Sequence, residues 1–186
     1  PGRKASPMFQ PDTQFLIDHW AALSQAPSTR GGIPSRAALE PQTLGLRLPR
    51  TFLADRLGET PCLRLAGGWI EAFHGEPLRD RPFFSLWTGA SRALIGAAVT
   101  QSVREARPVV VVATVGAAGS HIEVVLAPLR GPSGEPDRIL GLYAPSETLA
   151  LTRDESRLLT ARLSVGAGAP ARAPLSLAAV GGRRLA

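Results

Sequence analysis

The stretch LAPLRGPSGEPDRILGLYAP, residues 126–145, decides the fold that this sequence predicts. Two apolar runs that suit β-strands flank a short segment rich in Gly, Pro, Ser and acidic residues. Such a segment between apolar runs is typical of the turn of a β-hairpin. The stretch therefore predicts two antiparallel strands joined by a short loop.

Further strands and one helix are predicted on the N-terminal side of this hairpin. VVVVATV (residues 109–115) has the pattern of a buried strand, and RTFLADRLG followed by PCLRLAG (residues 50–67) predicts a second hairpin. Residues 91–107 carry apolar side chains at helical spacing, and Pro108 ends this helix. The fold class is α+β: a five-stranded antiparallel sheet with short helices and one long helix on one face. RLLTARLSV (residues 157–165) alternates well and is a candidate for one more strand.

An amphipathic helix is predicted before the sheet, within residues 8–27. In the stretch PDTQFLIDHWAALSQ, Asp12 is the expected N-cap, and Pro27 stops the helix. Its apolar side chains share one face and are those of Leu16, Ile17, Trp20 and Leu23. Such an apolar face can be buried in two ways: the helix can fold back on its own sheet, or it can pack against the same helix of a second subunit.

Charge is concentrated at the two ends of the chain. Of the formal net charge of +6, five charges come from Arg3 and Lys4 near the start and from three arginines within residues 166–186. The long segment between is nearly neutral, which disfavours nucleic acid as a partner, because a duplex-binding domain needs a basic face. We expect residues 1–7, which precede the only methionine, to be an expression remnant or disordered, and residues 166–186 to form a disordered basic tail.

Several other classes of site and protein are disfavoured by what the chain contains. It has one cysteine, and no apolar run reaches the roughly 18 residues that a membrane span needs. We expect a cytoplasmic protein without a signal segment. The histidines His19, His74 and His121 are not spaced like metal ligands, and no nucleophile stands beside a base. No metal site and no catalytic residue is therefore predicted.

The stretch FLADRLGETPCLRLAGGWIEAFHGEPLRDRPFFSLW (residues 52–87) and the closing hairpin resemble the PAS domains. The resemblance is to a bacterial variety of small single-domain proteins, found mainly in alphaproteobacteria and mostly of unknown role, and it covers roughly residues 10–150. It makes residues 28–165 a PAS-like domain and implies a cavity between the sheet and the short helices. The residues that carry it in the first stretch are Arg64, Leu65, Ala66, Gly67, Gly75, Glu76, Leu78, Phe84, Leu86 and Trp87.

The resemblance also bears on cofactors. PAS relatives that bind haem often use a histidine on the long helix, and residues 91–107 contain none. Light-sensing flavin relatives use a reactive cysteine in an asparagine-containing motif on the short helices. Here Cys62 lies in a predicted strand, and the chain has no asparagine. Haem and a photoactive flavin are therefore disfavoured, and the cofactor stays unknown.

Bulky side chains gather where the resemblance places the cavity. The candidates for its lining are Trp69, Ile70, Phe73, His74, Phe84, Leu86 and Trp87. The alternative is that these side chains simply fill the core.

The resemblance implies sensing or protein–protein signalling, and seldom catalysis. We predict a non-enzymatic regulatory protein that acts through protein–protein interaction with another regulatory protein, with a small-molecule ligand as an input. PAS relatives commonly dimerise through a helix before the domain, so we also predict a homodimer with Leu16, Ile17, Trp20 and Leu23 in its interface. The alternatives are a sensor whose main role is ligand binding and, less favoured, an enzyme with an unrecognised site.

Overall fold

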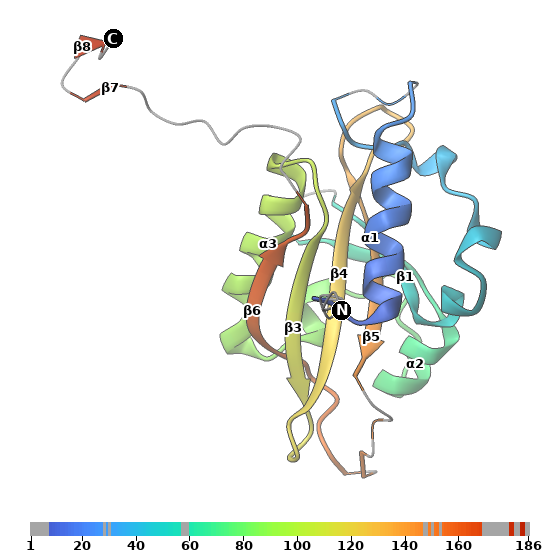
Figure 1. Cartoon of the computed structure of the whole chain (residues 1–186). Coiled ribbons are helices and arrows are strands. Elements are labelled where there is room, and N and C mark those ends of the chain that lie inside the picture. Colours follow the sequence, from blue (N-terminus) through green and yellow to red (C-terminus); the bar gives the residue numbers. More distant parts are fainter. Residues whose placement is uncertain are drawn as a thin grey trace, which may run out of the picture.

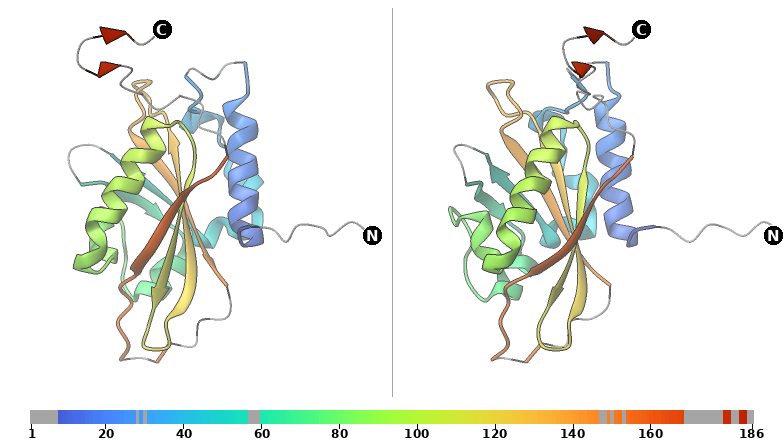
Figure 2. Two further views of the ribbon diagram at one scale, coloured as in Figure 1. Left: turned by 60° about the vertical axis from the view of Figure 1, so that its left-hand side comes forward. Right: turned by 90° about the vertical axis from the view of Figure 1, so that its left-hand side faces the viewer.

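The computed structural model of the chain describes residues 8–27, 29, 31–56, 60–146, 149, 151–152 and 154–168, and two short strands near the C-terminus. Within these residues, one antiparallel sheet has helices on both faces, with α1 and α3 on opposite sides (Figure 1). Figure 2 shows the sheet between these two helices from two further directions. No helix in this part of the chain is long and apolar enough to cross a membrane.

The sheet has six strands in the order β2-β1-β5-β4-β3-β6, and all neighbours are antiparallel. The α+β class is confirmed, and so is the hairpin of residues 126–145, in which Leu129 lies opposite Arg138. The predicted count of five strands is one too low, because residues 160–166 also pair with β3. The strands are β1 (Thr51–Asp55), β2 (Cys62–Ala66), β3 (Val109–Val115), β4 (Ser120–Leu129), β5 (Arg138–Pro145) and β6 (Thr160–Gly166).

The inner face of the sheet is covered by the helices that connect β2 to β3. Successive side chains of a strand point to opposite faces, so Val109, Val111 and Ala113 of β3 all join the core beneath these helices. This matches the predicted short helices and longer helix on one face. The helices are α2 (Gly68–His74), the 3-10 helices η3 (Phe83–Leu86) and η4 (Gly89–Ser91), and α3 (Arg92–Arg104).

The outer face is covered by the segment that precedes β1. It consists of α1 (Pro11–Ser24) and the short 3-10 helices η1 (Arg36–Ala38) and η2 (Pro41–Arg50). Leu16 and Trp20 pack with outward-facing side chains of β4 and β5 in a second core cluster. Both faces of the central strands are therefore buried, which explains the unbroken apolar run of β3.

The start of α1 differs from the predicted one. Pro11 lies in the first turn, where a missing N–H breaks no helical hydrogen bond, and Gln10 is the N-cap in place of Asp12. Asp12 lies inside the first turn, and its carboxylate oxygens are 2.9 Å from Arg47 Nε and 3.3 Å from Arg50 Nη1. These two ion pairs attach η2 to α1.

Both edge strands carry a β-bulge at an arginine. In β2, Arg64 is the extra residue, because its two neighbours pair with consecutive residues of β1. In β6, Arg162 is extra for the same reason against β3. A bulge interrupts the alternation of a strand. Leu65 and Leu163 therefore turn away from the core and are 54% and 47% exposed.

The end of the sheet lies slightly beyond its predicted place. Ala167 is buried, and its N–H donates to the carbonyl of Pro108 at 2.8 Å, so the predicted tail of residues 166–186 starts two residues too early. Within that tail, β7 (Ala179–Val180) and β8 (Arg183–Arg184) pair with each other. The rest of it, residues 169–178, 181–182 and 185–186, lies outside the described residues, as does the predicted expression remnant, residues 1–7.

Candidate functional site

An aromatic cluster occupies the space between the inner face of the sheet and the short helices. Phe52 of β1 stacks on Phe83 with 5.1 Å between the ring centroids, and it meets Tyr143 of β5 edge-on at 5.9 Å. Trp87 meets Phe83 edge-on at 6.0 Å. All four side chains are fully buried. This part of the inner face is therefore packed core.

The register of β1 on β5 makes the aromatic cluster possible. Phe52 lies opposite Gly141, and a Cβ at Gly141 would stand 2.0 Å from the Phe52 ring. The missing side chain lets the ring lie across β5 and meet Tyr143. A glycine at this position is thus required by a close approach rather than by a turn.

The structure places the seven cavity candidates in two groups. Ile70, Phe73, Leu86 and Trp87 are buried in the main core cluster and fill it in this structure. Trp69 and Phe84 are partly buried against that cluster, and His74 is half-buried at the end of α2. Two of the seven, Trp69 and Phe73, also line an open hollow on the surface.

His74 contacts the aromatic cluster through Tyr143. Its Nε2 lies 3.3 Å from the Tyr143 hydroxyl, within hydrogen-bond distance. Burial first, and then the positive charge of Arg157, lowers the pKa of His74 from 6.5 to about 4. Burial also raises the pKa of Tyr143. Both groups are therefore neutral near pH 7, and they form a hydrogen bond without charge.

The open hollow lies beside α2 and the end of β5, and we name it the α2 hollow. Its volume is about 520 Å³. Trp69 and Phe73 stack with 5.4 Å between their centroids, and the Arg50 guanidinium carbon lies 5.3 Å from the centre of the Trp69 ring. The hollow therefore combines aromatic rings with guanidinium groups. Its lining includes Arg50, Trp69, Phe73, Pro145, Leu151 and Arg157.

A much smaller groove lies on the outer face between η2 and strands β1 and β2, and we name it the η2 groove. Its volume is about 80 Å³, and most of its lining is apolar. Leu48 of η2 and Leu65 of β2 stand exposed at this groove, and Arg36 is the charged side chain in its described lining. The groove can therefore hold an apolar group next to one positive charge.

The four dimer candidates of α1 lie against the sheet of their own chain. Leu16, Ile17 and Trp20 are buried, and Leu23 is partly buried. The Trp20 indole N–H donates to the carbonyl of Pro128 at 2.7 Å. This position agrees with the alternative in which α1 folds back on the sheet of its own chain. A dimer that used these side chains would have to lift α1 off the sheet.

A family model described as a PAS domain matches residues 8–144. The chain belongs to the PAS domain family. The resemblance drawn from residues 52–87 and the closing hairpin is thereby confirmed, and with it a sensory or signalling role of the PAS type. A search among curated proteins gave no match.

Several solved structures match this PAS domain, and those named here are light-oxygen-voltage proteins. One, described with a flavin analogue, is 14% identical, and the match covers 57% of this chain and 84% of that one with a TM-score of 0.45. A Rhodobacter sphaeroides protein is 20% identical over 54% of this chain and 61% of its own, with a TM-score of 0.42. An RNA-binding receptor is 21% identical over 65% of this chain and 36% of its own, with a TM-score of 0.43.

These matches correct the prediction about the cofactor. Light-oxygen-voltage domains stand among the matched structures, and one of them is described with a flavin analogue. The prediction that disfavoured a photoactive flavin is therefore wrong. The flavin analogue and the RNA binding are properties of those proteins, and the charge-based argument against nucleic acid stays a prediction.

Sequence reasoning missed the arginines of the α2 hollow and the leucines of the η2 groove. Arg50 and Arg157 come from opposite ends of the domain, and no local pattern joins them. Alternation along β2 predicts that Leu65 shares the buried face of Leu63, and the bulge at Arg64 separates the two. A usable signal is present in TLGLRL, residues 43–48, where leucine at every second position indicates an apolar face.

Proposed function

We propose that this PAS domain is a regulatory protein that acts through protein–protein interaction at the η2 groove. The observation that supports this best is the gathering of exposed leucines on η2 and the neighbouring edge strand. Leu65 and Leu48 both line the groove, where Leu65 is 54% exposed and Leu48 is 38% exposed. Exposed apolar side chains that stand together mark interaction sites, whereas single ones are ordinary.

The size of the η2 groove fits a protein partner. Small-molecule sites usually have volumes of about 300–1,000 Å³, and this groove has about 80 Å³. Such a space accepts one aliphatic side chain. Anchor residues that fill small pockets contribute much of the binding free energy of protein interfaces.

The charges around the groove favour an acidic partner segment over a second copy of this chain. Arg36 lies in the lining, and Arg64 precedes Leu65 with a side chain that is 53% exposed, although it pairs with Asp55. Two-fold packing of this surface on itself would bring like charges together, which opposes binding. The proposed occupant is therefore an extended segment of another protein, with an aliphatic side chain flanked by carboxylates.

Two matched variants test this proposal. The probe is a labelled octapeptide of leucine and aspartate, and its control is the same peptide with lysine in place of aspartate. We expect the acidic peptide to bind the parent chain in fluorescence anisotropy, and Leu65→Asp to weaken that binding at least tenfold. Leu163→Asp should bind like the parent, because Leu163 follows the bulge of the opposite edge strand and has a similar exposure of 47%.

Equal binding by the two variants would contradict the proposal, and so would no binding of the acidic peptide at millimolar concentration. Sedimentation velocity tests the occupant. If the parent is a dimer that dissociates in Leu65→Asp but not in Leu163→Asp, the occupant of the groove is a second copy of the chain rather than an acidic partner.

A further inference from the structure

The α2 hollow has the dimensions of a ligand site. Its volume of about 520 Å³ lies within the usual range of about 300–1,000 Å³ for small molecules. Four parts of the chain build it: η2 supplies Arg50, α2 supplies Trp69 and Phe73, β5 supplies Pro145, and the segment before β6 supplies Arg157. We propose that this hollow binds a small amphipathic anion, with a planar apolar body and one carboxylate or phosphate group.

The argument for an anion rests on the two guanidinium groups. Arg50 pairs with Asp12 at 3.3 Å, whereas Arg157 Nη2 donates to the backbone carbonyl of Thr152 at 3.0 Å. No carboxylate is among the described residues that line the hollow. The charge of Arg157 also acts on the carboxylate of Glu155, which does not line the hollow, and on His74, which it helps to keep neutral. Guanidinium groups bind carboxylates and phosphates through forked pairs of hydrogen bonds, so an anion is the expected guest.

The argument for a planar body rests on the aromatic side chains. The rings of Trp69 and Phe73 are stacked with only 7° between their planes, and Trp69 is partly buried rather than covered. Pro145 and Leu151 add further apolar lining. A flat apolar ring can stack or pack here while its anionic group reaches the guanidinium groups.

Comparison with a neighbouring hollow explains why the anion is assigned to the α2 hollow. That hollow shares Arg50 and Trp69 but is also lined by Asp12. The Asp12 carboxylate pairs with both Arg47 and Arg50, so it compensates one of the two positive charges there. In the α2 hollow the lining contains Arg157 and does not contain Asp12. The inference is independent of the proposed partner, because the α2 hollow and the η2 groove share no lining residue among those described.

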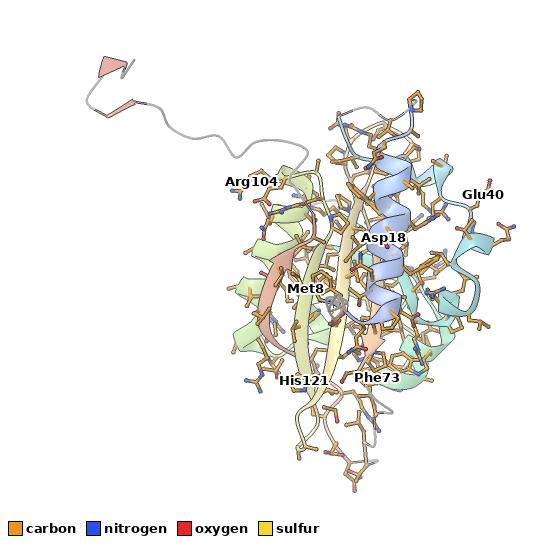
Figure 3. All side chains as sticks on the ribbon, in the orientation of Figure 1. Met8, Asp18, Glu40, Phe73, Arg104 and His121 are labelled. Carbon is orange, nitrogen blue, oxygen red and sulfur yellow. The ribbon has the colours of Figure 1, made fainter. Side chains whose placement is uncertain are left out.

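Calorimetric titration tests the site with 1-naphthoate and 1-naphthyl phosphate as probes and the uncharged 1-naphthalenemethanol as control. We expect at least one anion to bind at least tenfold more tightly than the alcohol, and the two anions to distinguish carboxylate from phosphate. Arg50→Gln and Arg157→Gln should each weaken anion binding about tenfold. Arg104→Gln removes the same charge far from Phe73 of the hollow (Figure 3) and should leave binding unchanged.

The three tryptophans locate the bound probe. Trp69 lines the hollow, whereas Trp20 and Trp87 are buried elsewhere. In NMR spectra, the indole N–H signal that disappears in Trp69→Phe should be the one that shifts on titration with the bound anion. The proposal is overturned by binding that ignores both arginine substitutions, by equal affinity for the alcohol, by shifts confined to the other two indoles, or by no anion binding at millimolar concentration. Thermal unfolding of each variant shows that it is folded.

Discussion

The η2 groove and the α2 hollow are built in part by the same segment, yet they differ in size and in charge. η2 contributes Leu48 to the groove and, two positions later, Arg50 to the hollow. Gly45 has a φ of +51° and breaks η2 into two turns, so that Leu44 is buried while Leu46 is exposed. One connector thereby offers an apolar surface to a partner and a cationic surface to an anion.

This difference shows where binding sites can form in a domain whose inner face is packed core. Phe52, Phe83, Trp87 and Tyr143 occupy the space beneath the short helices. The two proposed sites are instead formed at the surface, by connectors that rest on different layers. The groove depends on the outer layer, which α1 holds, and the hollow depends on α2 and the inner layer. Substitutions that disturb one layer should therefore separate the two sites.

The largest effect is expected from loosening the outer layer at Trp20. Trp20→Ala removes a buried indole and its hydrogen bond to Pro128, so the free energy of unfolding should fall by ~3–5 kcal/mol in urea titrations. Asp18→Ala is the matched control, because Asp18 lies on the exposed side of the same helix (Figure 3). It should change stability by less than ~0.5 kcal/mol.

The same variants test the predicted homodimer through α1. A parent chain that sediments as a monomer at high micromolar concentration would contradict that prediction. A parent dimer that Trp20→Ala converts into a monomer of unchanged stability would instead contradict the packing of α1 on its own sheet. A destabilised Trp20→Ala chain supports that packing.

The scaffold could be predicted further than the sites, because its signals are local. Turn residues and apolar runs within residues 126–145 suffice for the hairpin, whereas the bulge at Arg64 depends on which residues of β1 lie opposite. The alternation of residues 157–165 makes β6 a candidate strand, but its place at the edge beside β3 depends on pairing with residues far earlier in the chain. Trp69 and Phe73, one helical turn apart, were expected together, but Arg50 and Arg157 meet only once the whole sheet is assembled.

A drop in pH should loosen the inner layer through His74. Its pKa is about 4 in the folded chain and 6.5 ordinarily, so the unfolded chain takes up a proton at higher pH than the folded one. This contribution to stability is complete above pH 6.5 and is lost as the pH falls to 4, by up to ~3 kcal/mol. Urea titrations between pH 7 and 4 measure it, and His74→Gln should show less pH dependence than the parent.

Hydrogen bonds lower the pKa values of Glu105 and Glu155. These two residues are present in the parent and in His74→Gln, so they contribute equally to the pH dependence of the two proteins. The difference between the parent and His74→Gln therefore isolates the histidine. Parallel pH profiles for the two chains would show that protonation of His74 is not coupled to folding.

A smaller effect is expected from Gly141→Ala. The new Cβ would stand 2.0 Å from the Phe52 ring, so the ring must shift, at a cost of ~1–3 kcal/mol in unfolding experiments. The Phe52 ring belongs to the inner aromatic cluster, and Tyr143 of that cluster meets both aromatic rings of the α2 hollow edge-on. Binding of the naphthyl anion should therefore weaken more than binding of the acidic peptide. Gly68→Ala is the control, because its Cβ would meet no atom within 4 Å, and the opposite order of effects would contradict this separation of the sites.

The smallest change in stability, and the sharpest separation of the two sites, is expected from Asp12→Asn. The ion pairs to Arg47 and Arg50 are partly exposed, with Asp12 at 28%, so their loss should cost only ~0.2–1 kcal/mol. Removal of the carboxylate leaves Arg50 uncompensated, and calorimetry should show about two- to fivefold tighter anion binding in the α2 hollow. Asp18→Asn is the control, because its side chain accepts from Gln14 within the same helix.

Asp12 can act through its charge on Arg50 or by holding η2 in place. These two roles predict different outcomes for Asp12→Asn, and measurements at different ionic strengths distinguish them. If the carboxylate acts through its charge on Arg50, the gain in anion affinity should shrink as ionic strength is raised, and the acidic peptide at Arg36 should respond less than the naphthyl anion. If the ion pairs instead hold η2 in place, their loss should weaken the groove and the hollow together, at any ionic strength, because Leu48 and Arg50 belong to the same segment. Joint weakening would thus show that the position of η2, rather than the charge balance at Arg50, makes the two sites different.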